Sequence, residues 1–289
     1  MRTSRKILLL AAFSLVMAVI GAGEVLCRPA RRPIGEAPPD LQVRNLRLPY
    51  GQGETLSAWM LRGQPGRGAV LLLHGVRADR REMLGRARFL NQLGYAVLLP
   101  DLPAHGESSG EYITYGLREA EGVRAALGWL RRELPDEKLG VIGVSLGAAA
   151  FVLAQARPAP SAVVLESMFP SINEAVTNRL GLYLGAPGTV LAPLLLWQLP
   201  LRVSISPSQL QPISEMATMH SPLLIAAGTA DQHTPVAETQ RIFDAAVAPK
   251  DLWLVPGAAH VDLHAFAPHE YEARIATFLA RHLHAQAPI

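Results

Sequence analysis

The sequence predicts a three-layer α/β domain, with a mostly parallel sheet of about eight strands and helices on both faces. Short runs that are apolar throughout recur along the chain, as expected for strands buried on both faces of a parallel sheet. They alternate with longer segments whose apolar residues follow a helical period. The 289 residues, 49% of them hydrophobic, can bury one large core, and no internal repeat is visible.

The first elements of the domain are expected to be strands. Residues 46–49 and 55–61 are predicted to be two strands joined by the turn Gly51-Gln52-Gly53. Residues 69–73, AVLLL, are the first run that is apolar throughout. This run therefore predicts the first fully buried strand.

The next segments alternate between helix and strand. Residues 80–93 carry apolar residues at helical spacing and stop at Gly94. Residues 96–100, AVLLP, predict a second buried strand. Residues 115–134 predict a helix with a charged outer face, which Pro135 ends.

The second half of the domain continues this alternation on both sides of an interruption at residues 169–214. A strand at 139–143 leads into a helix at 146–155, and a strand at 162–166 follows. Beyond the interruption we predict a strand at 223–228, a helix at 236–246, a strand at 252–255 and a last helix at 269–284.

The N-terminus has the pattern of a targeting segment. Arg2, Arg5 and Lys6 precede an uncharged and almost wholly apolar run at residues 7–23. Its length lies between that of a signal-peptide core and that of a membrane span. We therefore expect either a signal peptide, cleaved after Gly21-Ala22-Gly23, or a membrane anchor. A buried core helix is the remaining alternative.

These patterns divide the chain into three parts. Residues 1–27 are the signal peptide or anchor, and they predict a membrane-anchored or exported protein. Residues 28–45, rich in proline and arginine, are predicted to be an extended linker. Residues 46–289 are the folded domain, with a cap inserted at about 169–214.

Composition excludes several partners. The net charge is only +3, and there is no basic stripe of the kind that nucleic-acid binding requires. Cys27 is the only cysteine, so no internal disulfide can form. No Cys/His cluster has zinc spacing, so we expect no structural metal. The oligomeric state is left open by the sequence.

Ser145 lies in VIGVSLGAAA, between a predicted buried strand and a predicted helix. A serine there sits on a sharp turn that crowds the neighbouring strands, and small residues two before and two after it relieve the crowding. Gly143 and Gly147 are those residues, so the pattern is that of a nucleophile elbow. A helix N-cap serine is the alternative.

A serine nucleophile needs a base, and the base needs an acid that orients it. Asp231 follows the strand at 223–228, and His260 follows the strand at 252–255. Both lie at the carboxyl ends of strands, as does Ser145, and such ends share one edge of a parallel sheet. The sequence therefore predicts a Ser145–His260–Asp231 triad.

With these residues in place, the chain resembles the α/β-hydrolase superfamily over about residues 46–283. The segments LLLHGVRADR, DLPAHGESSG, GVSLGA, GTADQHTP and PGAAH follow that family's order and spacing. Within it, the chain is similar to bacterial serine esterases, to monoacylglycerol-lipase-like enzymes and to acylaminoacyl- or prolyl-peptidase-like enzymes.

The resemblance implies roles for further residues. The backbone N–H groups of Val76 and Leu146 would form the oxyanion hole. His74 and His105 would be structural and hydrogen-bonded to loop backbone. No cofactor would be required. A serine at the elbow, rather than Asp or Cys, argues against haloalkane dehalogenases, epoxide hydrolases and dienelactone hydrolases.

Other residues compete for the role of the acid or suggest a different site. Glu166 ends a strand near the serine, and Asp262 follows His260 by two residues, although we expect Asp262 to point elsewhere. A metal site built from His260, Asp262 and His264 is a further alternative. His233 and His264 are otherwise expected to be solvated loop residues.

The insertion contains LGLYLGAPGTVLAPLLLWQLPL at residues 180–201, which Pro187, Pro193 and Pro200 interrupt. An apolar cap over an active site favours an ester substrate with an apolar acyl chain. The same leucines are explained equally well by packing of the cap onto the domain. A peptidase, a thioesterase or a membrane-tethered binding protein on the same fold are the alternatives to an esterase.

Overall fold

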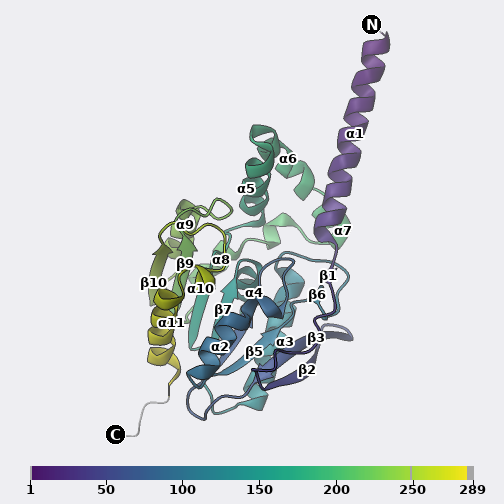
Figure 1. The fold of residues 1–289 in the computed structure, drawn as a ribbon. Coiled ribbons are helices and arrows are strands. Elements are labelled where there is room, and N and C mark those ends of the chain that lie inside the picture. The colour runs from purple at the N-terminus through teal and green to yellow at the C-terminus, as the bar shows by residue number, and fades with distance from the viewer. Residues whose placement is uncertain (1, 248, 285–289) are drawn as a thin grey trace.

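The chain folds into three layers around an eight-stranded sheet (Figure 1). The computed structural model of the protein describes residues 2–247 and 249–284. The strand order is β10-β9-β8-β7-β4-β5-β3-β2. β3 runs antiparallel to both of its neighbours, and the remaining pairs are parallel. This is the predicted fold class, with the predicted number of strands in the main sheet.

The strands lie where the apolar runs predicted them. Every residue of β4, β5, β8 and β9 is buried, because helices cover both faces of the sheet there. The strand bounds are β2 Val43–Tyr50, β3 Glu54–Leu61, β4 Ala69–Leu73, β5 Ala96–Pro100, β7 Leu139–Val144, β8 Ala162–Glu166, β9 Leu223–Gly228 and β10 Lys250–Val255.

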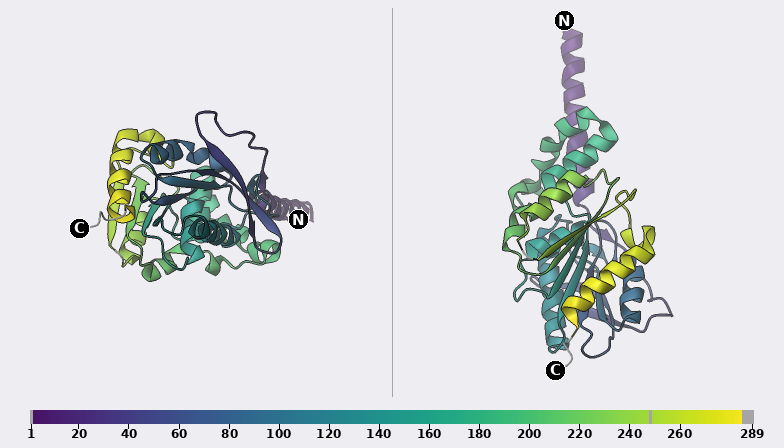
Figure 2. Two further views of the ribbon diagram at one scale, coloured as in Figure 1. Left: turned by 90° about the horizontal axis from the view of Figure 1, so that it is seen from below. Right: turned by 90° about the vertical axis from the view of Figure 1, so that its left-hand side faces the viewer.

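The main helices divide between the two faces of the sheet (Figure 2). Alternation along each strand makes this possible: Leu71 packs into the core on one face and Val70 into the core on the other. On the first face lie α3 Leu117–Glu133, α4 Leu146–Ala154 and α9 Val236–Ala245; on the second lie α2 Leu84–Gln92 and α11 Pro268–Leu283.

Two local features depart from the prediction. The helix predicted from residue 80 begins as a 3₁₀ turn, Arg80–Met83, and Asp79 caps its start by accepting the N–H of Arg81. A short helix, α10 Leu263–Phe266, also precedes α11. Asp262 caps α10 by accepting the N–H groups of His264 and Ala265. In both places an aspartate side chain, rather than apolar periodicity, starts the helix.

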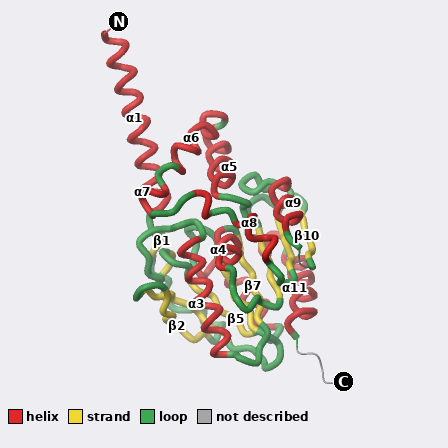
Figure 3. The backbone as a smooth tube through the Cα atoms, turned by 180° about the vertical axis from the view of Figure 1, so that it is seen from behind, coloured by secondary structure: helices red, strands yellow, loops and turns green. Residues whose placement is uncertain are grey.

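The cap rises above the carboxyl ends of the strands (Figures 1 and 3). Gly185, with φ of 63°, makes the turn between the two long cap helices α5 and α6. The cap consists of α5 Ile172–Leu184, α6 Ala186–Leu196, α7 Leu199–Val203 and α8 Pro212–Glu215, with 3₁₀ turns at Pro207–Gln209 and Met216–Thr218.

The N-terminal helix α1, Arg2–Cys27, projects from the cap end of the molecule (Figure 1). Among the residues that the structure describes, we find no helix with the length and apolarity needed to cross a membrane. The side chains of Arg2 and Arg5 lie outside the described part of the protein.

The predicted linker is extended, but it lies on the domain rather than between two separate parts. Strand β1, Ala30–Arg31, pairs in parallel with β6, His105–Gly106. Just before it, Cys27 is buried and its carbonyl accepts the N–H of Ile113 at 2.9 Å. Just after it, Ile34 is buried as well. The chain from residue 27 to 34 is therefore part of the folded structure.

Candidate active site

Ser145 occupies a strained turn between β7 and α4. Its backbone has φ of 49° and ψ of −108°, which is unusual for a residue with a side chain. The neighbouring strand and the helix hold it there. Its N–H donates to the carbonyl of Glu166 at 2.8 Å, and its carbonyl accepts the N–H of Ala149 at 3.0 Å. The turn therefore fixes the serine at the carboxyl end of β7 and the N-terminus of α4.

The two glycines of the elbow are required by space. A Cβ on Gly143 would lie 2.7 Å from the nitrogen of Ala148, and one on Gly147 would lie 2.5 Å from the carbonyl oxygen of Leu73. Contacts that short with backbone atoms would force the chain apart. The predicted role of both residues at the elbow agrees with this geometry.

Asp231 and His260 are brought together at the same edge of the sheet. Asp231 follows β9 and His260 follows β10, and these strands are parallel neighbours. The Oδ2 of Asp231 lies 2.7 Å from the Nδ1 of His260. This contact leaves the Nε2 of His260 as the nitrogen that can exchange a proton with another group.

The Asp231 carboxylate is buried and fully engaged. Its Oδ1 accepts the N–H groups of His233 and Thr234 at 2.8 and 2.9 Å, and its Oδ2 accepts the hydroxyl of Thr234 at 2.8 Å. Burial by itself would raise the pKa of Asp231. The hydrogen bonds from His260 and Thr234 outweigh it and hold the pKa below its ordinary value. The carboxylate therefore stays charged beside the imidazole.

Ser145 is not hydrogen-bonded to His260 through its side chain within the described residues. Its position at the end of β7 is two strands from β9 and three from β10 in the sheet order. Catalytic hydrogen bonds are often long without substrate and shorten in the complex. The structure thus joins two of the three predicted triad members directly and places the third on the same edge.

The loop after β4 carries Val76 and is held from two sides. The Nε2 of His74 accepts the N–H of Leu102 at 2.9 Å, so its Nδ1–H donates to the carbonyl of Gly75 at 2.7 Å. The N–H of Gly75 donates to the carboxylate of Glu82 at 2.6 Å. Burial, with the nearby His105, lowers the pKa of His74 to about 3, so its ring is neutral. His74 is structural, as predicted.

The structure also places His105, Val76 and Leu146 around this loop. The Nδ1 of His105 contacts the carbonyl of Pro103 at 2.8 Å, as expected for a structural histidine. Leu146 is the first residue of α4 and is buried. Val76 and Leu146 thus lie in the segments that follow β4 and β7, which are adjacent parallel strands.

The rival acids are engaged elsewhere. Glu166 bonds the buried guanidinium of Arg86 at 2.6 Å and the hydroxyl of Tyr271 at 2.6 Å. Asp262 pairs with the same arginine at 2.8 Å, in addition to capping α10. Neither carboxylate contacts His260. The arginine instead ties the end of β8 to the segment that follows His260, and so supports the position of that histidine.

Two histidines differ from the prediction. We expected His233 and His264 to be solvated. The His264 ring is mostly buried, and its Nε2 lies 2.9 Å from a carboxylate oxygen of Glu272. The His233 ring packs against His260 with centroids 4.9 Å apart, and burial lowers its pKa. Among the described residues, His260, Asp262 and His264 form no cluster that could hold a metal ion, and each has a different partner.

Sequence reasoning missed Asn178, which links the cap to the acid loop. Its side-chain amide on α5 donates to the carbonyl of His233 at 3.1 Å and to Glu238 at 2.7 Å. No local pattern marks a single asparagine on a cap helix. Thr234 was also missed. A hydroxyl residue three positions after an aspartate is typical of a local hydrogen-bonded turn, and that spacing could have identified it.

The loop that carries Val76 is joined to α1 through the next residue. The guanidinium of Arg77 donates to the carbonyls of Val25 and Leu26, at the end of α1. The hydroxyl of Tyr115 donates to Leu26 as well, at 3.0 Å. These carbonyls lack partners within the helix, and a cation is favourable at a helix C-terminus. The end of α1 is therefore capped by the loop expected to hold the oxyanion.

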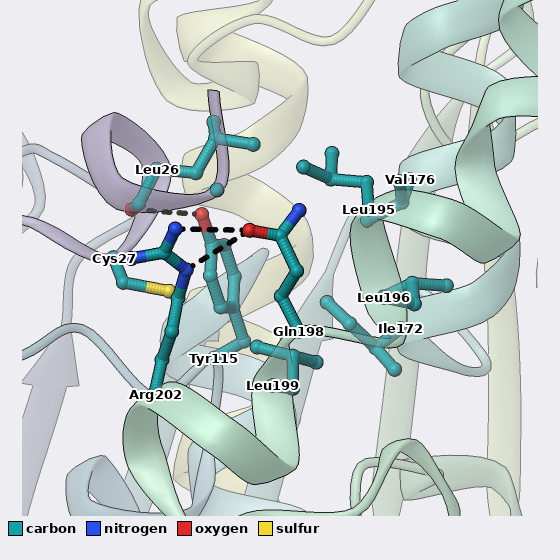
Figure 4. A pocket seen from close by; sticks show the side chains of 11 residues that line it. Leu26, Cys27, Tyr115, Ile172, Val176, Leu195, Leu196, Gln198, Leu199 and Arg202 are labelled. Carbon is teal, nitrogen blue, oxygen red and sulfur yellow. Dashed lines mark hydrogen bonds between the residues drawn. The ribbon is translucent and has the colours of Figure 1, made fainter. Parts of the chain in front are cut away.

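A small pocket lies between α1 and the cap (Figure 4). It is lined by Leu26, Cys27, Tyr115, Leu195 and Arg202, among others. Its cavity volume of about 30 Å³ is too small for a substrate. None of the predicted triad residues lines it.

Comparison with known proteins gives consistent matches. The family profile described as "alpha/beta hydrolase fold" matches residues 68–204. An uncharacterized protein of Mycobacterium tuberculosis, Rv2307c, is 33% identical over 240 residues, covering 81% of this chain and 78% of its own. YqkD of Bacillus subtilis, also uncharacterized, is 22% identical over 236 residues, covering 80% and 77%.

Solved structures with this fold are also similar. The esterase Pf2001 of Pyrococcus furiosus superposes with a TM-score of 0.72 at 26% identity, covering 89% of this chain and 98% of its own. A dienelactone hydrolase from Anabaena variabilis superposes with a TM-score of 0.61 at 19% identity, covering 84% and 98%.

Proposed function

This chain belongs to the α/β-hydrolase superfamily, and on that basis we propose that it is a serine hydrolase that cleaves carboxylic esters. The α/β-hydrolase fold and an esterase among its structural neighbours support hydrolase activity. The hydrogen bond of 2.7 Å between Asp231 and His260, on the same sheet edge as the strained Ser145, is the observation that carries the proposal.

The proposed reaction proceeds through an acyl-enzyme. Ser145 Oγ attacks the ester carbonyl while the Nε2 of His260 takes its proton, and the oxyanion is held by the N–H groups of Val76 and Leu146. His260 returns the proton to the leaving alcohol as the C–O bond breaks. Water then attacks the acyl-enzyme, losing a proton to His260, and His260 passes that proton to Ser145 Oγ as the acyl C–Oγ bond breaks and the carboxylic acid leaves. Asp231 holds the imidazole tautomer throughout.

The apolar composition of the cap supports an apolar acyl group as the substrate portion bound under it. No charged side chain in the cap other than Arg179 and Arg202 lies between Glu174 and Glu215. The cap therefore matches an apolar acyl chain better than it matches a charged peptide or a polar acid. The proposed reaction needs only groups of the protein and water.

The test is labelling of the whole protein with a fluorophosphonate, followed by a panel of acyl esters, thioesters and aminoacyl amides. We expect the wild type to be labelled and Ser145→Ala not to be, with loss of ester turnover by at least about a thousandfold. Labelling that persists in the variant would place the nucleophile elsewhere. Preferential cleavage of amides or thioesters would make the protein a peptidase or a thioesterase instead.

We also propose that α1 is retained and places the enzyme at a membrane, with its domain outside the cytoplasm. A discarded signal peptide would have no reason to be bonded to the mature domain. Here Gln198 donates to the carbonyl of Val19 at 2.9 Å, and Arg202 donates to that of Ile20 at 2.6 Å. Mass spectrometry of the N-terminus from the native host tests this, and a chain beginning after Gly23 would refute it.

A further inference from the structure

The apolar side chains that remain exposed are concentrated at one end of the molecule. Among the described residues, all the large exposed ones lie on α1 or the cap except Leu93, Val247, Val261 and Phe266. Six on the cap are each more than half exposed, and we call them the cap surface: Tyr183, Leu184, Val190, Leu194, Trp197 and Leu201.

The cap surface differs from the leucines beside it. Leu195 and Leu196 are both buried, and Leu196 packs with Cys27 in a small core that joins the cap to α1. They account for the packing role that the sequence allowed for this segment. Leu194 and Trp197, by contrast, are 53% and 69% exposed. The cap therefore has an apolar exterior that its own core does not use, and soluble monomers rarely keep such patches.

The cap surface and α1 are held as one unit. Besides its bond to the carbonyl of Ile20, Arg202 forms an ion pair with Glu24 of α1. Figure 4 shows Arg202, Gln198 and Tyr115 gathered at the end of α1. Figures 1 and 2 show α1 rising beside the α5–α6 hairpin. The exposed apolar residues of α1, such as Phe13 and Met17, thus belong to the same end of the molecule as the cap surface.

Charge and residue type favour one kind of partner for this end. Between Glu174 and Glu215 the cap has no acidic residue, and its charged residues are Arg179 and Arg202. Tyr183 and Trp197 are the residue types that favour the boundary between lipid and water. The turn of the α5–α6 hairpin projects from the cap (Figure 1) and is free of charge from residue 180 to 190. A bilayer with some anionic lipid fits these features, because it can admit an apolar tip and attract the exposed Arg179.

We propose that the cap surface rests in the headgroup region of a lipid bilayer beside α1, so that the enzyme takes acyl esters from the membrane. The choice of substrate rests on the proposed function. The geometry links the two sites: Asn178 joins α5 to the loop of Asp231, and Arg77 joins α1 to the loop of Val76. The docked end and the candidate active site therefore share the edge of the sheet at which the strands end.

Quenching of Trp197 by brominated phosphatidylcholine tests the docking directly. The full-length protein is mixed with vesicles of this lipid, with and without phosphatidylglycerol, and is compared with Trp197→Phe. The other three tryptophans, Trp59, Trp129 and Trp253, lie in the α/β domain. We expect strong quenching that Trp197→Phe largely removes and that phosphatidylglycerol increases. Equal quenching of the two proteins, or none, would overturn the proposal.

A matched pair of variants identifies the surface. Tyr183→Gln, Leu184→Gln and Val190→Gln together should reduce Trp197 quenching at least severalfold. Val247→Gln with Phe266→Gln, at exposures of 65% and 50% but away from the cap, should leave it unchanged. Quenching of the cap variant at the wild-type level would mean that a lipid bilayer does not cover the cap surface. The same conclusion would follow if the wild type were a dimer without lipid and the cap variant alone were a monomer.

Ser145→Ala separates docking from catalysis. Because the cap surface does not contain the serine, this variant should be quenched like the wild type. A docked protein that cleaves no ester would refute the proposed function and leave the docking in place. An active esterase without Trp197 quenching would refute the docking and leave the proposed function in place.

Discussion

At the scale of single residues, Asp231 and Asp262 offer a direct comparison. Asp231→Asn should lower kcat/KM by about 10⁴, because the amide favours the wrong tautomer of His260. Asp262→Asn should change the rate much less and lower the melting temperature, since Asp262 pairs with buried Arg86 and caps α10. Steady-state kinetics and thermal denaturation of both variants check this. A larger rate loss in Asp262→Asn than in Asp231→Asn would show that Asp231 is not the acid of the triad.

His74 predicts how stability depends on pH. Its folded-state pKa of about 3 lies below the ordinary histidine value of about 6.5, so the unfolded chain takes up a proton first as the pH falls. Its contribution to stability is therefore full above about 6.5 and is lost progressively toward pH 3. The melting temperature should fall less steeply over this range in His74→Gln than in the wild type. Parallel slopes for the two proteins would contradict the prediction.

Residues with chemical roles could be predicted from the sequence where local spacing encodes the geometry. Gly143, Ser145 and Gly147 are an example, since the turn itself demands them. The burial of Arg86 could not be predicted, because its partners Glu166, Tyr271 and Asp262 are distant in sequence. The same holds for His264, whose neighbours come from two other helices.

At the scale of elements, a variant in the cap helix α6 can distinguish a packing role of its leucines from a role in acyl binding. Leu196 lies in the core shared with Cys27, so Leu196→Ala should destabilise the cap by about 2–5 kcal/mol. Turnover of p-nitrophenyl esters should then fall by a similar factor for every acyl length. Thermal denaturation and a chain-length series measure the two effects. A loss confined to long acyl chains would show instead that Leu196 contacts the substrate.

The strands could be predicted more closely than the cap. Strands buried on both faces, such as β4 and β9, must be apolar throughout, and this pattern is local. The cap helices are apolar on inner and outer sides alike, so the pattern of residues 180–201 does not reveal which leucines face outward. Leu194 is exposed, whereas Leu195 and Leu196 are buried, and this difference depends on how α6 and α7 pack against α1.

At the scale of the whole molecule, the segment before the domain decides how the protein can be shortened. A chain beginning at Glu24 keeps Cys27 in the cap core, β1 beside β6, and the ion pair of Arg32 with Asp79. One beginning at Asp40 loses all three. We expect the Asp40 form to melt at a lower temperature and to turn over esters more slowly than the Glu24 form. Equal melting and turnover of the two would show that residues 24–39 act only as a spacer.

The docking of α1 also constrains the order of events when the protein is made. Gly23 is buried, and a Cβ on it would lie 2.6 Å from the side-chain oxygen of Gln198, so the cap is closed over the peptide bond at which a signal peptidase would cut. A protease needs that bond extended and open, whereas here it is helical and covered. If the segment directs export, cleavage after Gly23 has to precede closure of the cap, and a chain in which the cap has closed keeps α1.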